Sequence, residues 1–223
     1  MDESPLAEEI LFAIGPVPIA REVATTWAIM AALGLIAWFS TRRLQLRPGG
    51  WQIVLETVVS ILAKQIRDVM RRDPAPFMPL IGTLFLFIAT ANLSALLPGV
   101  KAPTARIETP AALALIVFFA VHGYGIRAQG LRRYLARYVH PSPLLLPLNV
   151  VGEITRTFSL MVRLFGNVMS HEIVVGIIVA LAGLLVPIPF MALTILIGLI
   201  QAYIFTVLAT VFIAAGVGAV ETG

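Results

Sequence analysis

Five long apolar runs, separated by short polar connections, take up most of this 223-residue chain. About 20 apolar residues make a helix that crosses the hydrocarbon core of a bilayer. The runs cover residues 23–40, 77–97, 111–126, 148–186 and 190–218. Overall 59% of the residues are hydrophobic and 13% are charged, which is not typical of a soluble domain. Since a chain in lipid must pair its backbone polar groups internally, we predict an all-α integral membrane protein with about five membrane helices.

One further helix differs from these spans. In residues 51–70 the apolar side chains share one face, whereas charged residues such as Glu56 and Lys64 lie elsewhere, and Trp51 stands at the start. This pattern indicates an amphipathic helix that lies at the membrane interface. The last two apolar runs are longer than a perpendicular span requires, and the turn between them contains Pro187. We therefore expect these two helices to form a tilted antiparallel hairpin.

The distribution of basic residues predicts how the chain is oriented. Of the 16 Lys and Arg residues, 11 lie in two connections: Arg42, Arg43, Arg47, Lys64, Arg67, Arg71, Arg72, Arg127, Arg132, Arg133 and Arg137. Basic clusters beside membrane spans usually mark the cytoplasmic side. This places the N-terminus outside and the C-terminus in the cytoplasm, and it explains the basic charge without a nucleic-acid partner. Three parts follow: an outside segment (1–22), peripheral membrane helices (23–145) and the C-terminal hairpin (146–223).

A single arginine, Arg163, lies near the middle of the fourth apolar run. Arginine keeps its charge in proteins, and a charge at the bilayer centre costs at least a few kcal/mol. No acidic residue lies within one helical turn of Arg163. Such a residue is a functional-site hypothesis by default. We infer that its counter-charge comes from another molecule, and that it ionises a passing carboxylic acid and repels cations that would leak through.

Further polar residues accompany Arg163 in the hairpin. At about 100° per residue, an arc of about 80° contains several of them: Glu153, Arg156, Arg163, Asn167 and His171. Glu172 is expected on the opposite face. In the last run Thr194 and Gln201 share a face, and Gln201 is placed to bond the guanidinium if the two helices pack antiparallel.

Simpler interpretations of these residues stay open. Glu153 and Arg156 are three residues apart, so they can form a helix-surface ion pair. Asn167 and Gln201 can serve as interhelical hydrogen-bonding groups. For His171 and Glu172 we favour a water-filled path over partial hydration alone, because Glu172 has no basic residue near it in sequence.

The segment Ser159–Asn167, which reads SLMVRLFGN, is followed by Glu172 and by Gln201–Phe205. This pattern resembles subunit a of F-type ATP synthases. The similarity covers residues 147–215 and, more loosely, 77–126, where Pro103-Thr104-Ala105 is similar to an outer-loop motif of the family. It implies a stator subunit of a bacterial inner membrane that works against a ring of rotor c subunits, with peripheral-stalk b subunits as further partners.

The resemblance also implies roles for residues. Arg163 would be the essential arginine that faces the carboxylate of the rotor ring. The positions of the ion path and its supporting groups would be Asn167, His171, Glu172, Thr194 and Gln201, with Glu153 and Arg156 near the inner exit. The sequence departs from the family where Asp and Asn are common, at Arg106 and Glu108. Thr157 replaces a usual proline, and Asn149 stands where an acidic residue is common.

These observations predict an ion-translocating subunit, with the proton favoured as the ion, in which two aqueous half-channels are separated by Arg163. We expect no catalytic centre, cofactor or metal in this chain, which lacks a Gly-rich phosphate loop. The first alternative is a stand-alone secondary cation/proton antiporter, in which Arg163 and Glu172 form the switch. The second is a purely structural assembly subunit.

Overall fold

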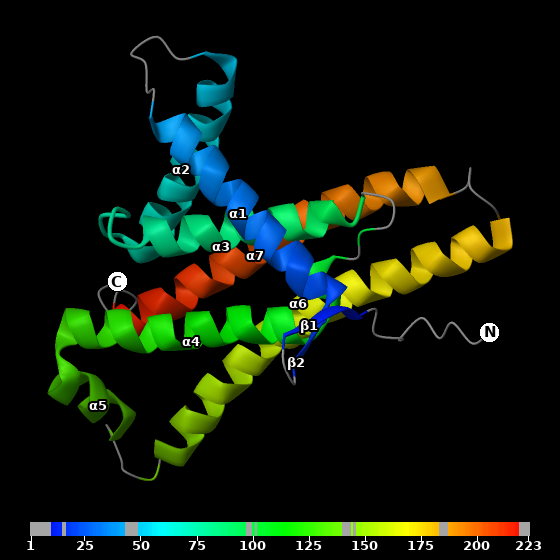
Figure 1. Ribbon diagram of the computed structural model, residues 1–223. Coiled ribbons are helices and arrows are strands. Elements are labelled where there is room, and N and C mark those ends of the chain that lie inside the picture. The colour runs from blue at the N-terminus through cyan, green and yellow to red at the C-terminus, as the bar shows by residue number, and fades with distance from the viewer. Residues whose placement is uncertain are drawn as a thin grey trace.

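The computed structural model describes residues 10–14, 17–42, 49–96, 100, 102–139, 144, 146–182 and 187–218. In these ranges the elements are β1 (Ile10–Ile14), β2 (Val17–Ala20), α1 (Arg21–Thr41), α2 (Gly50–Met70), α3 (Met78–Ser94), the 3-10 helix η1 (Pro103–Ala105), α4 (Glu108–Gln129), α5 (Leu131–Val139), α6 (Leu146–Ala182) and α7 (Pro187–Val217). Figure 1 shows a helical molecule with one small antiparallel hairpin, β1–β2. The predicted all-α membrane class is confirmed, and the hairpin is an unpredicted addition before α1.

Within the described ranges four helices are long and apolar enough to cross a membrane, with spans at Val23–Thr41, Glu108–Gln129, Leu146–Ile178 and Pro189–Val217. The fifth predicted span, residues 77–97, contains α3, which has only 17 helical residues. This length is at the lower end of the range for a membrane helix, about 17–25 residues.

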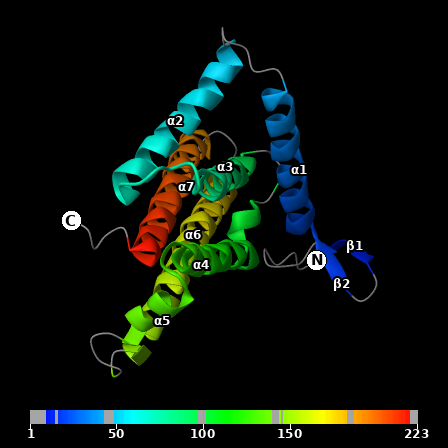
Figure 2. The ribbon, with the colours of Figure 1, turned by 90° about the vertical axis from the view of Figure 1, so that its left-hand side faces the viewer.

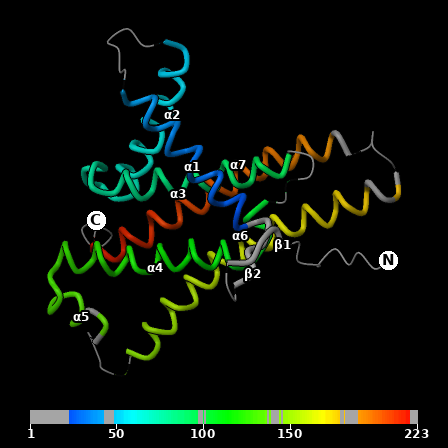
Figure 3. The backbone as a smooth tube through the Cα atoms, in the orientation of Figure 1, coloured from blue at the N-terminus to red at the C-terminus, as the bar shows by residue number. Residues whose placement is uncertain are grey.

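The last two helices form the expected hairpin. α6 has 37 residues and is therefore about 55 Å long, nearly twice the thickness of a bilayer core of about 30 Å. α7 runs back against it, and both are oblique to α4 (Figure 1). In Figure 3 the end of α6 and the start of α7 lie at the end of the molecule opposite to the C-terminus. A helix of this length fits a membrane only when it is tilted.

α2 lies across the other helices, as an interfacial helix should. Figures 1 and 2 show it running across one end of α3 and α7. Its buried face carries Leu62, Ile66 and Met70, whereas Trp51 and Ile53 are exposed. The helix ends at Arg71, which adopts the left-handed conformation with φ 51° and donates its backbone N–H to the Arg67 carbonyl.

The second basic connection contains a helix that we did not predict. Gly130, with φ 80°, ends α4, and α5 follows directly. Tyr134 of α5 is buried, with its ring edge toward His122 of α4. The C-terminal end of α7 lies at the same end of the molecule as α2 and α5 (Figure 1).

α7 is the centre of the packing, since it contacts α2, α3, α4 and α6. Two glycines allow its close approach to α4. A Cβ added to Gly216 would lie 2.9 Å from the Val121 carbonyl oxygen, and one added to Gly125 would lie 2.8 Å from the Gly216 carbonyl oxygen. By contrast, only Leu160 and Leu164 are buried among the α6 side chains that the structure describes.

Candidate functional site

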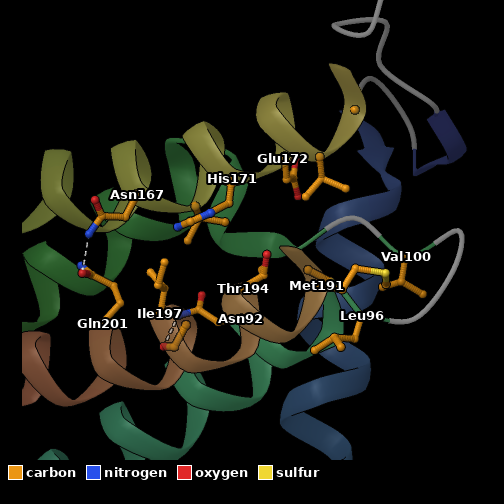
Figure 4. A pocket seen from close by; sticks show the side chains of 15 residues that line it. Asn92, Leu96, Val100, Asn167, His171, Glu172, Met191, Thr194, Ile197 and Gln201 are labelled. Carbon is orange, nitrogen blue, oxygen red and sulfur yellow. Dashed lines mark hydrogen bonds between the residues drawn. The ribbon is translucent and has the colours of Figure 1, made fainter. Parts of the chain in front are cut away.

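A cavity of about 290 Å³ opens between α3, α6 and α7. Five of the residues that the sequence places on the ion path line it: Asn167, His171, Glu172, Thr194 and Gln201. Figure 4 shows them arranged along the cavity, with Asn167 and Gln201 at one end and Glu172 near Val100 at the other. The cavity thus brings together predicted site residues from two different helices, α6 and α7.

At one end of the cavity the two helices of the hairpin are joined by an amide pair. Asn167 Nδ2 donates a hydrogen bond to Gln201 Oε1 at 2.6 Å (Figure 4). Gln201 is only 2% exposed, and its Nε2 has no hydrogen-bond partner among the described residues. We expected Gln201 to bond the Arg163 guanidinium. The structure pairs it with Asn167 instead, because Asn167 lies one turn further along α6 and opposite Gln201.

At the other end of the cavity Glu172 reaches the loop before η1. Its Oε1 accepts a hydrogen bond of 3.4 Å from the backbone N–H of Ala102. The helical wheel places Glu172 about 180° from Arg163, yet Glu172 and Asn167 line the same cavity. Thr194 also lines this cavity, and its hydroxyl donates to the carbonyl of Phe190 on its own helix at 2.9 Å.

Asn92 of α3 is a cavity residue that we did not predict. It is 5% exposed, its Nδ2 donates to the Gly198 carbonyl at 2.9 Å, and its Oδ1 accepts from Thr104 Oγ1 at 2.8 Å. The signal was present in the sequence, since Asn92 is an amide inside an apolar run, as is Asn167. An amide in an apolar run can form a hydrogen bond to a neighbouring helix, as Asn92 does to α7.

Arg163 lies outside the cavity lining, one helical turn from Asn167. Its neighbours Leu160 and Leu164 are buried in the core, whereas Arg163 is exposed. Within the described ranges it makes no hydrogen bond or ion pair.

Toward the other end of α6, Arg156 Nη1 lies 3.7 Å from Glu153 Oε2. Glu153 is largely buried, and the Arg156 guanidinium lies over the ring of Phe212 of α7, 5.9 Å from the ring centroid. Arg156 precedes Arg163 by two helical turns, about 10 Å along the axis. Arg156 and Arg163 therefore do not belong to one cluster. The ion pair between Glu153 and Arg156, which the sequence analysis left open, is present.

Near the start of α4, Arg106 Nε lies 3.9 Å from Glu108 Oε2. Two of the four residues that depart from the family pattern, Arg106 and Glu108, therefore contact each other. Among the described residues no three His, Asp or Glu side chains are grouped as a metal site would require.

Comparison with known proteins identifies the family. The family model described as "ATP synthase A chain" matches residues 23–214. "ATP synthase subunit a 2" of Bradyrhizobium sp. is 63% identical over 223 residues, which are the whole of both chains. "ATP synthase subunit a 2" of Pelobacter propionicus is 49% identical, covering 96% of this chain and 93% of the relative. "ATP synthase subunit a" of Legionella pneumophila is 42% identical, covering 99% and 96%. The chain, a multi-pass membrane protein, therefore belongs to the ATP synthase subunit a family.

Proposed function

We propose that this chain is the proton-translocating stator subunit of the membrane sector of a rotary ATP synthase. Arg163 faces the carboxylates of a rotor ring and separates two aqueous half-paths. One observation carries the proposal: an arginine in the middle of a membrane helix is exposed and has no partner among the described residues. A permanent charge at that depth needs a counter-charge, and a rotor carboxylate supplies one that arrives and leaves.

The outer half-path is the cavity of α3, α6 and α7. Protons enter past Glu172 and His171 and reach the rotor carboxylate near the Asn167–Gln201 pair. Arg163 follows one turn further along α6, where it favours the ionised form of the carboxylate and repels a cation moving straight through. This order of residues prevents a short circuit between the two sides.

The inner half-path begins on the other side of Arg163 and leads past Glu153 and Arg156 to the cytoplasm. Because α6 is continuous from Leu146 to Ala182, both half-paths are aligned on one rigid element. Rotation of the ring carries a loaded carboxylate from one path to the other. The rotor c subunits cover the exposed side of α6, and peripheral-stalk b subunits and lipid contact the remaining surface.

The test of the proposal is the variant Arg163→Ala in the complete ATP synthase, assayed for ATP-driven proton pumping in inverted membrane vesicles. We expect pumping to fall below detection while the subunit still assembles, because its exposed side chain stabilises no contact in the described part of the chain. Arg163→Lys keeps the charge as a point cation that can deprotonate when desolvated. It should retain less than about a tenth of the activity.

Arg127→Ala is the matched control, since Arg127 is an exposed arginine at the end of α4. It should pump as the unmodified enzyme does. Normal pumping by Arg163→Ala would overturn the proposal and leave an assembly role. Ion exchange by the purified chain alone, reconstituted in liposomes without a rotor ring, would favour the stand-alone antiporter.

A further inference from the structure

We propose that Thr104 and Asn92 are positioning residues of the outer half-path, which hold the backbone N–H of Ala102 against the Glu172 carboxylate. The inference deepens the proposed function and rests on it. It assigns a role to a buried polar cluster that the Arg163 mechanism alone does not use.

The cluster joins three elements through two side chains. Thr104 in η1 is fully buried and donates its hydroxyl to Asn92 Oδ1 at 2.8 Å. Asn92 in α3 also forms a hydrogen bond to α7, because its Nδ2 donates to the Gly198 carbonyl at 2.9 Å. Buried polar groups that are fully paired restrain the elements that carry them. Thr104 is therefore held relative to both α3 and α7.

Close helix packing makes this connection possible. A Cβ added to Gly198 would lie 3.0 Å from the Asn92 Cβ, so α3 and α7 approach here at the limit of contact. A residue with a side chain at position 198 would push Asn92 away from the Gly198 carbonyl. Gly198 thus allows Asn92 to form both hydrogen bonds, one through Nδ2 to the Gly198 carbonyl and one through Oδ1 to Thr104.

The position of Thr104 determines that of Ala102, because the two belong to one tight turn. The Ala105 N–H donates to the Ala102 carbonyl at 3.0 Å, and Ala102 is itself fully buried. The Ala102 N–H then points to Glu172 Oε1 at 3.4 Å. Because a hydrogen bond has a preferred direction, this donor favours one orientation of the Glu172 carboxyl group. Glu172 is thereby oriented toward the cavity, where Figure 4 shows it on the same helix as His171 and across the cavity from Thr194.

The test compares Thr104→Val with Thr104→Ser in the complete ATP synthase. Valine keeps the shape of threonine and removes the hydroxyl donor, whereas serine keeps the donor. We expect Thr104→Val to lower ATP-driven proton pumping about five- to tenfold, the effect of losing roughly one hydrogen bond at a positioned group. Thr104→Ser should stay within about twofold of the unmodified enzyme, since the hydrogen bond survives.

Thr90→Val is the control for removing a threonine hydroxyl, because Thr90 donates only to the Leu86 carbonyl of its own helix at 2.7 Å, and pumping should be unchanged. In a Glu172→Ala background, where the acceptor is absent, Thr104→Val should cause no further loss. If Glu172→Ala alone already abolishes pumping, the comparison of valine with serine at position 104 decides.

Three results would overturn the inference: normal pumping by Thr104→Val, equal losses for valine and serine, or failure of Thr104→Val to assemble. The last would make Thr104 a folding residue. Arg163→Ala, assayed in parallel, separates this inference from the proposed function. If Arg163→Ala abolishes pumping and Thr104→Val does not affect it, only the role of Thr104 fails.

Discussion

The side-chain amide of Gln201 is buried between α6 and α7, and among the described residues only its oxygen has a hydrogen-bond partner. That oxygen accepts the 2.6 Å bond from Asn167 Nδ2, whereas its Nε2 is buried with no hydrogen-bond partner in the described ranges. An unmade hydrogen bond of a buried group is costly, so the stabilising contribution of this amide comes from its oxygen and not from its nitrogen. A donor at the cavity that has no partner among the described residues is suited to a transient acceptor such as water or a carboxylate of the proposed rotor ring.

At this scale we predict that Asn167 and Gln201 are energetically coupled. Asn167→Leu and Gln201→Leu should each destabilise the chain, and the double variant should be more stable than the sum of the two losses implies. The coupling should be about 0.5–1.5 kcal/mol, the range for hydrogen bonds between membrane helices. A double-mutant cycle on unfolding in detergent measures it. Thr194→Val combined with Gln201→Leu should be additive, because the Thr194 hydroxyl bonds within its own helix. Additivity in both cycles would refute the coupling.

At the scale of elements, α4 and α7 depend on glycine for their contact. A Cβ on Gly216 would lie 2.9 Å from both the Val121 carbonyl oxygen and its Cγ1. A backbone oxygen cannot avoid the clash by a side-chain rotation, so the two helices would have to move apart. We predict that Gly216→Ala destabilises the chain by about 1–3 kcal/mol, the typical effect of overpacking. Gly123→Ala, on the same helix as Val121, has open space around the new methyl group and should be neutral or stabilising. Thermal unfolding in detergent distinguishes them, and equal stability of both variants would contradict the argument.

The sequence predicts those elements whose identity rests on hydrophobic pattern. The long spans, the amphipathic helix α2 and the overlong hairpin all follow from apolar length and periodicity. α5 is not predicted because it is short and contains three arginines in nine residues, and what stabilises it is the burial of Tyr134 against α4. The same limit applies to the site. Asn167, His171, Glu172, Thr194 and Gln201 line one cavity, although periodicity places Glu172 on the opposite face of its helix from Arg163, and their role in an ion path stays a prediction. The Asn92–Thr104 link depends on the contact between α3 and η1, which periodicity does not encode.

For the whole molecule, the difference between α6 and α7 indicates where partners bind. α7 is buried from several sides, whereas α6 exposes most of its described side chains, Arg163 included. An exposed apolar helix is acceptable in lipid, but an exposed arginine at that depth is not. We therefore expect a protein partner, the proposed rotor ring, to cover the surface of α6 around Arg163.

The proposed orientation of the whole molecule gives a further prediction, and the absence of cysteine from the chain makes it directly testable. Ile107 and Leu131 are exposed, at 47% and 58%, and lie at opposite ends of α4, whose 22 residues span about 33 Å. Basic residues follow α4 at the Leu131 end, so that end should be cytoplasmic. In intact cells a membrane-impermeant maleimide should label Ile107→Cys and leave Leu131→Cys unlabelled, and inverted vesicles should give the reverse. Labelling of Leu131→Cys from outside would mean that the orientation in the membrane is the reverse of the proposed one. The cavity would then open to the cytoplasm, and the outer and inner half-paths would be exchanged.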